Sequence, residues 1–226
     1  DLPSGLDPAG VEGTAECVFA DETVTFGVAK PCHLLPATEA AVGRLTVVDI
    51  GLDFAGCTPV VERLLGADVA AAWPVPTAAS DKYSRGVVGV VAGSAAYPGA
   101  GVLCVLGALG TGPGMVRYLG PTSVAALVHG HAPEAVTATG RVQAWVLGSG
   151  VDPEDTDDED QLRWIRQALD SDLPCVVDAG ALALLGPRSA PTLITPHAGE
   201  LARLLTRLAG AGGADVTPEG VFGRPL

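Results

Sequence analysis

The sequence is poor in basic residues and has no long apolar segment. Its 226 residues include 13 lysines and arginines against 26 aspartates and glutamates, which gives a formal net charge of -13. Because nucleic-acid binding needs Lys and Arg to neutralise phosphates, this balance argues against nucleic acid as a partner. No run approaches the roughly 18 apolar residues of a membrane span, and the first residues lack the pattern of a secretory signal. We therefore expect neither nucleic acid nor a membrane as a partner.

The cysteines form no recognisable pattern. There are five, an odd number, and none belongs to a C-x-x-C pair. Neither a disulfide framework nor a zinc site is indicated, and a cytoplasmic location fits best. With 48% hydrophobic residues, the chain can bury one large core or two smaller ones.

The first part of the chain predicts a small strand pair followed by a connection. Segments 23–26 and 43–53 are rich in β-branched residues, which favours strands, and a loop containing Pro and His joins them. The apolar spacing over 60–65 predicts a helix that Pro74 would help to end. We expect a domain boundary within 54–80.

The rest of the chain alternates between strand and helix patterns. Predicted strands cover 86–93, 115–120, 142–150, 173–180 and 192–196, and predicted helices cover 99–112, 158–172 and 198–210. This alternation is typical of right-handed βαβ units, so the fold class is α/β with a parallel sheet. In such sheets ligands bind outside the carboxyl ends of the strands. His33, His129 and His131 lie in polar or Pro-rich surroundings, and we expect them in loops.

A loop of small residues follows the first of these strands. Gly93, Ser94, Gly99, Ala100 and Gly101 leave the backbone uncovered where a strand turns into a helix. Free N–H groups there can bind a ligand, or the glycines simply make a tight turn. The segment matches neither G-x-G-x-x-G nor G-x-x-x-x-G-K-[ST].

Later strand exits carry polar side chains. In "ITPHAGE", His197 either caps the next helix or contacts a ligand, and Glu200 falls in the first helical turn. Asp178 either caps the following helix or binds a metal or a hydroxyl. The acidic run 152–160 is better explained as a solvated stretch at a helix N-terminus than as a metal site. At the start of the chain, "DLPSG" is either an ordinary turn or a site in which Asp1 holds a sugar hydroxyl or acts as a base and Ser4 offers an oxygen to a cation.

Taken in order, these blocks resemble two known families. "DLPSGLD", "ADETVTFGVAKPCHLLP" and "GRLTVVDIGLD" are similar to the last third of the NAD(P)H-hydrate epimerase domain. "DKYSRGVVGVVAGSAAYPGAGVL", "GTGPGMVRYLGP", "VLGSGVD", "VVDAGAL" and "LITPHAGELARLL" resemble the NAD(P)H-hydrate dehydratase domain. The two domains are commonly fused in this order in bacteria.

The resemblance implies a ribokinase-like, mostly parallel sheet flanked by helices, preceded by the C-terminal part of a Rossmann-like epimerase domain. Residues 1–53 would belong to the epimerase, 54–80 to a linker, and 81–226 to the N-terminal part of the dehydratase. The implied activity is ADP-dependent dehydration of (S)-NAD(P)H hydrate, with epimerisation of the R and S hydrates. Phosphorylation would turn the hydroxide of the hydrate into a better leaving group.

The resemblance also implies particular site residues and cofactors. Asp1, Ala100, Gly150 and His197 would contact the hydrated cofactor, and Ser4 would help to hold potassium. ADP (or ATP), Mg²⁺ and K⁺ are the implied cofactors, and the full-length enzyme is expected to be a homo-oligomer.

The chain departs from the family pattern in two places. It has "GSGVD" where members have "GPGLG", and it lacks the Lys-containing nucleotide loop and the G-[ST]-G-D segment whose Asp is the base. We therefore expect a piece of a longer protein that is inactive alone. A ribokinase-type kinase for a vitamin or sugar, or a non-catalytic cofactor-binding fragment, are the alternatives.

Overall fold

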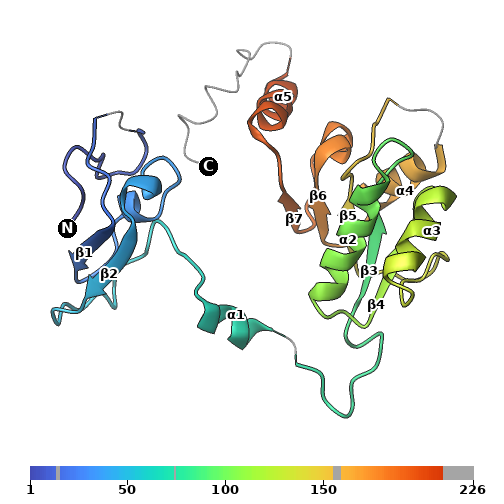
Figure 1. The fold of residues 1–226 in the computed structure, drawn as a ribbon, viewed down its shortest axis with the longest axis horizontal. Coiled ribbons are helices and arrows are strands. Elements are labelled where there is room, and N and C mark those ends of the chain that lie inside the picture. Colours follow the sequence, from blue (N-terminus) through green and yellow to red (C-terminus); the bar gives the residue numbers. More distant parts are fainter. Residues whose placement is uncertain (14–15, 74, 155–158, 211–226) are drawn as a thin grey trace. The chain divides into compact units, whose positions relative to one another are not determined.

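The computed structural model describes residues 1–13, 16–73, 75–154 and 159–210 (Figure 1). These residues fall into two compact units, Asp1–Trp73 and the described part of Pro74–Gly213. None of the described helices is long and apolar enough to cross a lipid bilayer.

The first unit contains a two-stranded parallel sheet. Strands β1 (Glu22–Phe26) and β2 (Arg44–Val48) pair in parallel, and the short 3-10 helices η1 (Pro31–His33) and η2 (Glu39–Ala41) lie between them in sequence. Both predicted strands are confirmed. His33 is not in a loop as expected, because it belongs to η1 and is buried.

The helix predicted over 60–65 is wrong. Those residues have no regular structure, and Val60 and Leu64 are 83% and 76% exposed. An apolar helical spacing stabilises a helix mainly when that face packs on something, and here it does not. The helix in this region is α1 (Gly66–Ala72), which begins where the Asp68 carboxylate accepts the N–H of Leu65 at 2.8 Å.

The second unit is a five-stranded sheet with the order β4-β3-β5-β6-β7, in which every neighbouring pair is parallel. The strands are β3 (Val87–Val91), β4 (Met115–Tyr118), β5 (Ala144–Leu147), β6 (Cys175–Val177) and β7 (Thr192–Ile194). The helices are α2 (Pro98–Gly110), α3 (Thr122–His131), α4 (Glu159–Leu169) and α5 (Ala198–Ala209), with the 3-10 helix η3 (Ala179–Leu184) after β6. The predicted α/β class is confirmed.

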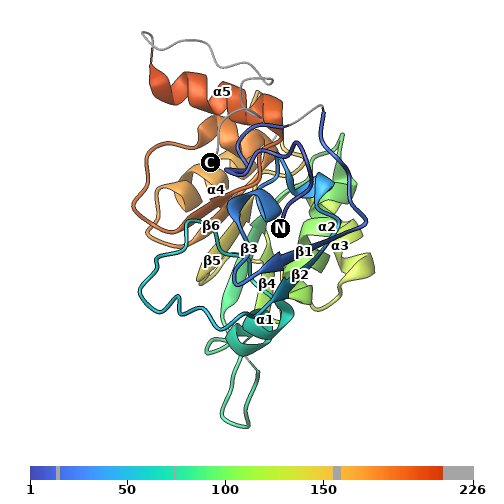
Figure 2. The same cartoon turned by 90° about the vertical axis from the view of Figure 1, so that its left-hand side faces the viewer.

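Helices cover both faces of the sheet around β3. Successive side chains of a strand point to opposite faces. Val90 packs in a core cluster with residues of α2 and α3, whereas Val91 packs in the cluster that includes Ile165 of α4. Figure 2 shows α4 on one side of β3, β5 and β6, with α2 and α3 on the other. The apolar run of β3 is therefore a strand buried on both faces, as its composition predicts.

Helix α3 is absent from the sequence prediction. Its buried residues, Val124 and Val128, are one turn apart, but few other large apolar residues mark the helical face. His129 and His131 lie in this helix, so their predicted loop positions are wrong.

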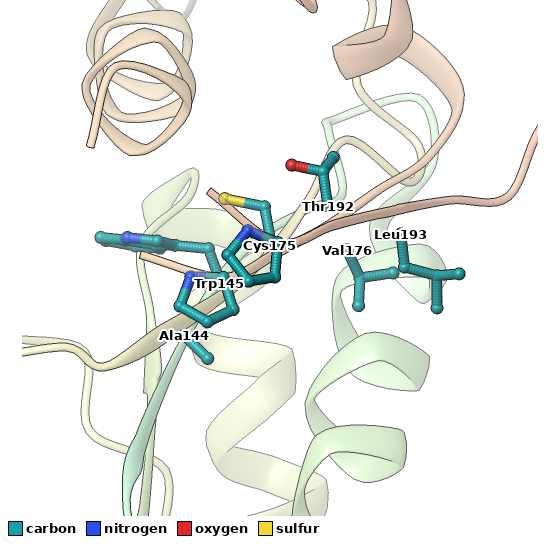
Figure 3. A pocket seen from close by; sticks show the side chains of 8 residues that line it. Ala144, Trp145, Cys175, Val176, Thr192 and Leu193 are labelled. Atoms are coloured by element: carbon teal, nitrogen blue, oxygen red, sulfur yellow. The ribbon is translucent and has the colours of Figure 1, made fainter. Parts of the chain in front are cut away.

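The amino-terminal ends of β5, β6 and β7 form an open groove of about 330 Å³. Figure 3 shows Val176 and Leu193 pointing to one side of the strands, with Cys175 and Thr192 on the other. Leu193 is 61% exposed. This groove lies away from the carboxyl ends, where the sequence places the candidate site.

Candidate functional site

The carboxyl ends of β3 and β5 form a topological switch point. Strand β3 lies between β4 and β5. The connection that leaves β3 leads to β4 on one side, whereas the connection that leaves β5 leads to β6 on the other side. Ligands of open α/β sheets bind at such points. The loops after the two strands are in direct contact, because the N–H of Gly93 donates to the carbonyl of Ser149 at 2.7 Å.

Ala100 and Gly150 meet at this point. Ala100 lies in the first turn of α2, and Gly150 follows β5 with φ +70°. A Cβ added to Gly150 would lie 2.5 Å from the Cβ of Ala100 and 3.1 Å from that of Tyr97. Only glycine allows this approach without a shift of the helix. The structure thus brings together two of the predicted contact residues.

The glycines of the small-residue loop have different roles. Gly93 has φ +77°, and a Cβ there would lie 2.9 Å from the backbone nitrogen of Gly101. A Cβ on Gly101 would lie 2.7 Å from Val124, so packing explains both glycines. Gly99, in contrast, faces open space, with nothing within 4 Å of such a Cβ. It leaves the N-terminal turn of α2 uncovered, where the positive end of the helix dipole favours an anion, although Pro98 has no N–H and the N–H of Ala100 donates to the carbonyl of Tyr97 at 3.2 Å.

His197 caps helix α5 at the exit of β7. Its ring Nδ1 accepts the backbone N–H of Gly199 at 3.1 Å, and its backbone N–H donates to Glu200 Oε2 at 2.9 Å. Its Nε2 lies 3.4 Å from Glu200 Oε1, and its side chain is 68% exposed. The capping role is therefore present, and the exposed ring edge leaves a ligand contact as a prediction.

Asp178 connects three strand exits. Its Oδ2 accepts the hydroxyl of Ser149, after β5, at 2.8 Å, and its Oδ1 accepts the hydroxyl of Thr195, after β7, at 2.9 Å. Although Asp178 precedes η3, its side chain makes no capping hydrogen bond. Of the two alternatives for Asp178, the helix cap is therefore wrong, and the carboxylate accepts hydroxyls from neighbouring loops.

Cys104 of α2 lies beside this cluster. Burial raises the pKa of the Cys104 thiol, the Ser149 hydroxyl lowers it, and the charge of Asp178 raises it. No motif in the chain connects this cysteine with the strand exits.

The acidic run is only partly described. Residues 155–158 lie outside the described residues. Glu159 and Asp160 occupy the first turn of α4, so the predicted helix N-terminal placement is confirmed for these two. Asp160 also pairs with Arg163 at 2.9 Å.

In the first unit, Asp1 lies at the carboxyl end of β1. Its Oδ1 accepts the hydroxyl of Thr25 at 3.1 Å, the N–H of Phe26 at 3.2 Å and the ammonium of Lys30 at 3.1 Å. Lys30 also donates to the hydroxyl of Thr25. The carboxylate is thus fixed by one cation and two neutral donors.

His33 forms hydrogen bonds with the backbone of both Asp1 and Lys30. Its Nδ1 accepts the N–H of Lys30 at 3.0 Å, and its Nε2 donates to the carbonyl of Asp1 at 2.7 Å. Both ring nitrogens are therefore used by the neutral ring. Burial, and next the charge of Lys30, lower the pKa of His33.

The described residues do not form a metal site. No group of three or more His, Cys, Asp and Glu side chains among them is placed to hold an ion. The backbone carbonyl of Ser4, the predicted potassium ligand, accepts the N–H of Val18 at 2.9 Å. One exposed serine does not make a potassium site, and the described carboxylates do not make one for Mg²⁺. The nucleotide loop of the family is also absent from the sequence.

Sequence reasoning missed several residues of both sites: Thr25, Lys30 and His33 in the first unit, and Cys104, Ser149 and Thr195 in the second. Ser149 and Thr195 each lie in the last residues of a predicted strand (142–150 and 192–196), which is the available signal. Lys30 and His33 have none, because a 3-10 helix brings them back to Asp1.

The parallel sheet, the helices on both faces and the switch point define an open α/β protein. A ribokinase-like superfamily protein from Enterococcus faecalis matches with a TM-score of 0.52 at 19% identity, over 62% of this chain and 55% of that chain. An ADP/ATP-dependent NAD(P)H-hydrate dehydratase from Bacillus subtilis, co-crystallised with ATP/Mg²⁺, also gives a TM-score of 0.52, at 28% identity, over 62% of this chain and 54% of that chain.

Sequence comparison gives the family. The model of the NAD(P)H-hydrate dehydratase family matches residues 88–217. The bifunctional NAD(P)H-hydrate repair enzyme Nnr of Mycobacterium tuberculosis is 47% identical over 216 residues, which are 90% of this chain and 43% of that protein. The chain belongs to the NAD(P)H-hydrate dehydratase family. It spans less than half the length of this curated relative.

Proposed function

We propose that the complete gene product dehydrates (S)-NAD(P)H hydrate to NAD(P)H with ADP, and couples this to epimerisation of the R and S hydrates. The observation that supports it most is the contact of Ala100 with Gly150 at the switch point, in a chain of this family. In this proposal the second unit supplies part of the dehydratase substrate site.

The uncovered backbone is suited to a dinucleotide. Ala100 and Gly150 present no bulk at the exits of β3 and β5, and α2 begins there with the uncovered backbone of Gly99 and the positive end of its dipole. These groups would bind the anionic part of the substrate, which a net charge of -13 would otherwise repel. The exposed imidazole of His197 would contact the same molecule from the exit of β7.

In the first unit, Asp1 would contact the hydrate at the epimerase site. Its partner Lys30 keeps the carboxylate in place and compensates its charge. Thr25 would orient both groups. Oδ1 of Asp1 accepts all three of these hydrogen bonds, and Oδ2 would face the substrate.

The cofactor assignments rest on the family. We infer ADP or ATP with Mg²⁺ for the dehydratase, and K⁺ held in part by Ser4 for the epimerase. Because the described residues form no site for either metal ion, we assign no chemical step through these groups to this chain.

The organisation follows the same inference. We assign residues 1–53 to the C-terminal part of the epimerase, 54–80 to a linker, and 81–226 to the N-terminal part of the dehydratase. We also infer a cytoplasmic protein that forms a homo-oligomer at full length, with neither nucleic acid nor membrane as partner.

A glycine substitution tests the proposal. In the complete gene product, Gly150→Ala would drive a methyl group into Ala100 and should weaken the binding of (S)-NADPH hydrate at least tenfold by isothermal titration calorimetry, a loss of about 1.4 kcal/mol. The control is Gly107→Ala in α2, where an added Cβ meets nothing within 4 Å. Absence of binding by the unmodified protein, or unchanged affinity in Gly150→Ala, would contradict the proposal. The 226-residue chain alone should show no dehydration, because it lacks the G-[ST]-G-D segment.

A further inference from the structure

The Asp178 carboxylate joins loops that carry two of the proposed substrate contacts. Through Ser149 it holds the residue directly before Gly150, and through Thr195 it holds the segment two residues before His197. The carbonyl of Ser149 accepts the N–H of Gly93, so the connection extends to the exit of β3. The Asp178 side chain thus connects the exits of β5, β6 and β7 directly, and the exit of β3 indirectly through the backbone of Ser149.

The backbone around Asp178 is constrained on both sides. Ala179, the next residue, has φ +44°, a conformation that costs free energy for a residue with a Cβ. Gly148 has φ +103°, and a Cβ there would meet the carbonyl of Asp178 and the side chain of Ala181. The loops after β5 and β6 are therefore closely packed, and a shift at Asp178 would displace the loop that carries Gly150.

We propose that Asp178 is a positioning residue of the substrate site, whose two hydrogen bonds hold Gly150 and His197 toward one ligand. This inference rests on the proposed function. It differs from a role as a metal ligand or a base in what the carboxylate does, because each of its oxygens accepts a hydroxyl from a neighbouring loop. Bonds of this kind, with one charged partner, are stronger than neutral ones and fix geometry well.

The test compares two substitutions of Asp178 in the complete gene product. Asp178→Ala removes both hydrogen bonds, and we expect KM for (S)-NADPH hydrate to rise roughly tenfold while kcat changes less than about threefold. Asp178→Asn keeps an oxygen and an NH₂ group of the same shape, which can pair with both hydroxyls, so KM should stay within roughly threefold of the parent. The matched control is Asp172→Ala, an exposed carboxylate before β6.

Single-arm variants cover the case in which Asp178→Ala does not fold. Ser149→Ala and Thr195→Val each remove one hydrogen bond, and each should raise KM by a smaller factor than Asp178→Ala. In the Asp178→Asn background each substitution should still raise KM, because the introduced amide pairs with both hydroxyls and each substitution removes one of these hydrogen bonds. If neither single-arm variant changes KM, the inference is overturned.

Two further outcomes decide between roles. If Asp178→Asn loses as much as Asp178→Ala, the negative charge itself is required and the positioning role is wrong. If the unsubstituted complete gene product does not turn over hydrated NADPH, the proposed function fails. Hydrogen exchange of the backbone amides in 148–151 and 195–199 then decides whether Asp178 holds these two loops. We expect exchange to accelerate there in Asp178→Ala but not in Asp172→Ala, and equal exchange would overturn the inference.

Discussion

The two parallel sheets differ in how much of their surface they bury. Strand β3 is buried on both faces, with Val87, Val90 and Val91 at most 1% exposed. In β1 only alternate residues are buried, and Val24 and Phe26 remain 43% and 48% exposed. The five-stranded unit therefore has a core cluster on each face of β3, whereas the first unit has one small cluster (Leu6, Cys32, Ala41 and Val42) and leaves Val24 and Phe26 of β1 exposed.

The two candidate sites also differ in the interactions that hold their carboxylates. The Asp1 carboxylate relies on an exposed ion pair with Lys30, whose side chain is 32% exposed. Asp178 relies on two hydroxyls of neighbouring loops in a sheet with a packed core. Ion pairs at a surface contribute little and are screened by salt, so the geometry of the first site depends more on solution conditions.

The largest expected effect is the loss of stability when a buried side chain of the second unit is truncated. Ile165 of α4 is 0% exposed in the core of the second unit, and Ile165→Ala should lower the free energy of unfolding of that unit by about 3–4 kcal/mol. Phe26→Ala removes a larger side chain from the exposed face of β1 and should cost less than about 1 kcal/mol. Urea unfolding followed by circular dichroism measures both. Equal losses would contradict the difference between the sheets.

A smaller effect is a pH dependence confined to the first unit. The pKa of His33 is lowered in the folded state, chiefly by burial, so the unfolded chain takes up the proton first as the pH falls below about 6.5. The contribution of His33 to stability is therefore complete above that pH and is lost as the pH falls toward the folded-state pKa.

An NMR titration of the His33 ring, together with urea unfolding between pH 7.5 and pH 5, measures this effect. His33→Gln should flatten the pH dependence. The control His131→Gln, in α3 of the other unit, should leave the first unit unchanged. A His33 ring that protonates above pH 6.5 in the folded protein would contradict the expectation.

The smallest effect concerns the rate at which two thiols are alkylated. Cys57 is exposed in the first unit, whereas burial raises the pKa of Cys104 in the second. Because the thiolate is the reactive form, Cys104 should react with iodoacetamide more slowly than Cys57 at pH 8, and should become reactive on unfolding. Mass spectrometry of the digested protein measures both sites. Equal rates in the folded state would show that Cys104 is accessible.

Much of the second unit is predictable from sequence because its signals are local. The apolar run of β3 and the helical spacing that ends at Gly210 each specify an element without knowledge of its neighbours. The helix predicted from the spacing of Val60 and Leu64 is wrong because a local periodicity does not show whether a packing partner exists. Helix α3 was missed because its buried face is only Val124 and Val128.

The site was predictable as a location but not as a set of contacts. Strand exits can be read from the chain, and they contain Ala100, Gly150, Asp178 and His197. Which exits touch depends on the strand order, which places β5 beside β3 rather than beside β4. The hydrogen bonds of Asp178 to Ser149 and Thr195 follow from that order. The pairing of Asp1 with Lys30 similarly depends on the turn that η1 makes.

The strand order also affects how the sheet can be made during synthesis. Strand β4 pairs with β3, which precedes it, β5 adds to the free edge of β3, and β6 and β7 then each add to the strand made before. Among the described strands, each can therefore pair with a strand that was made before it, and this sheet can grow from its amino-terminal side during synthesis.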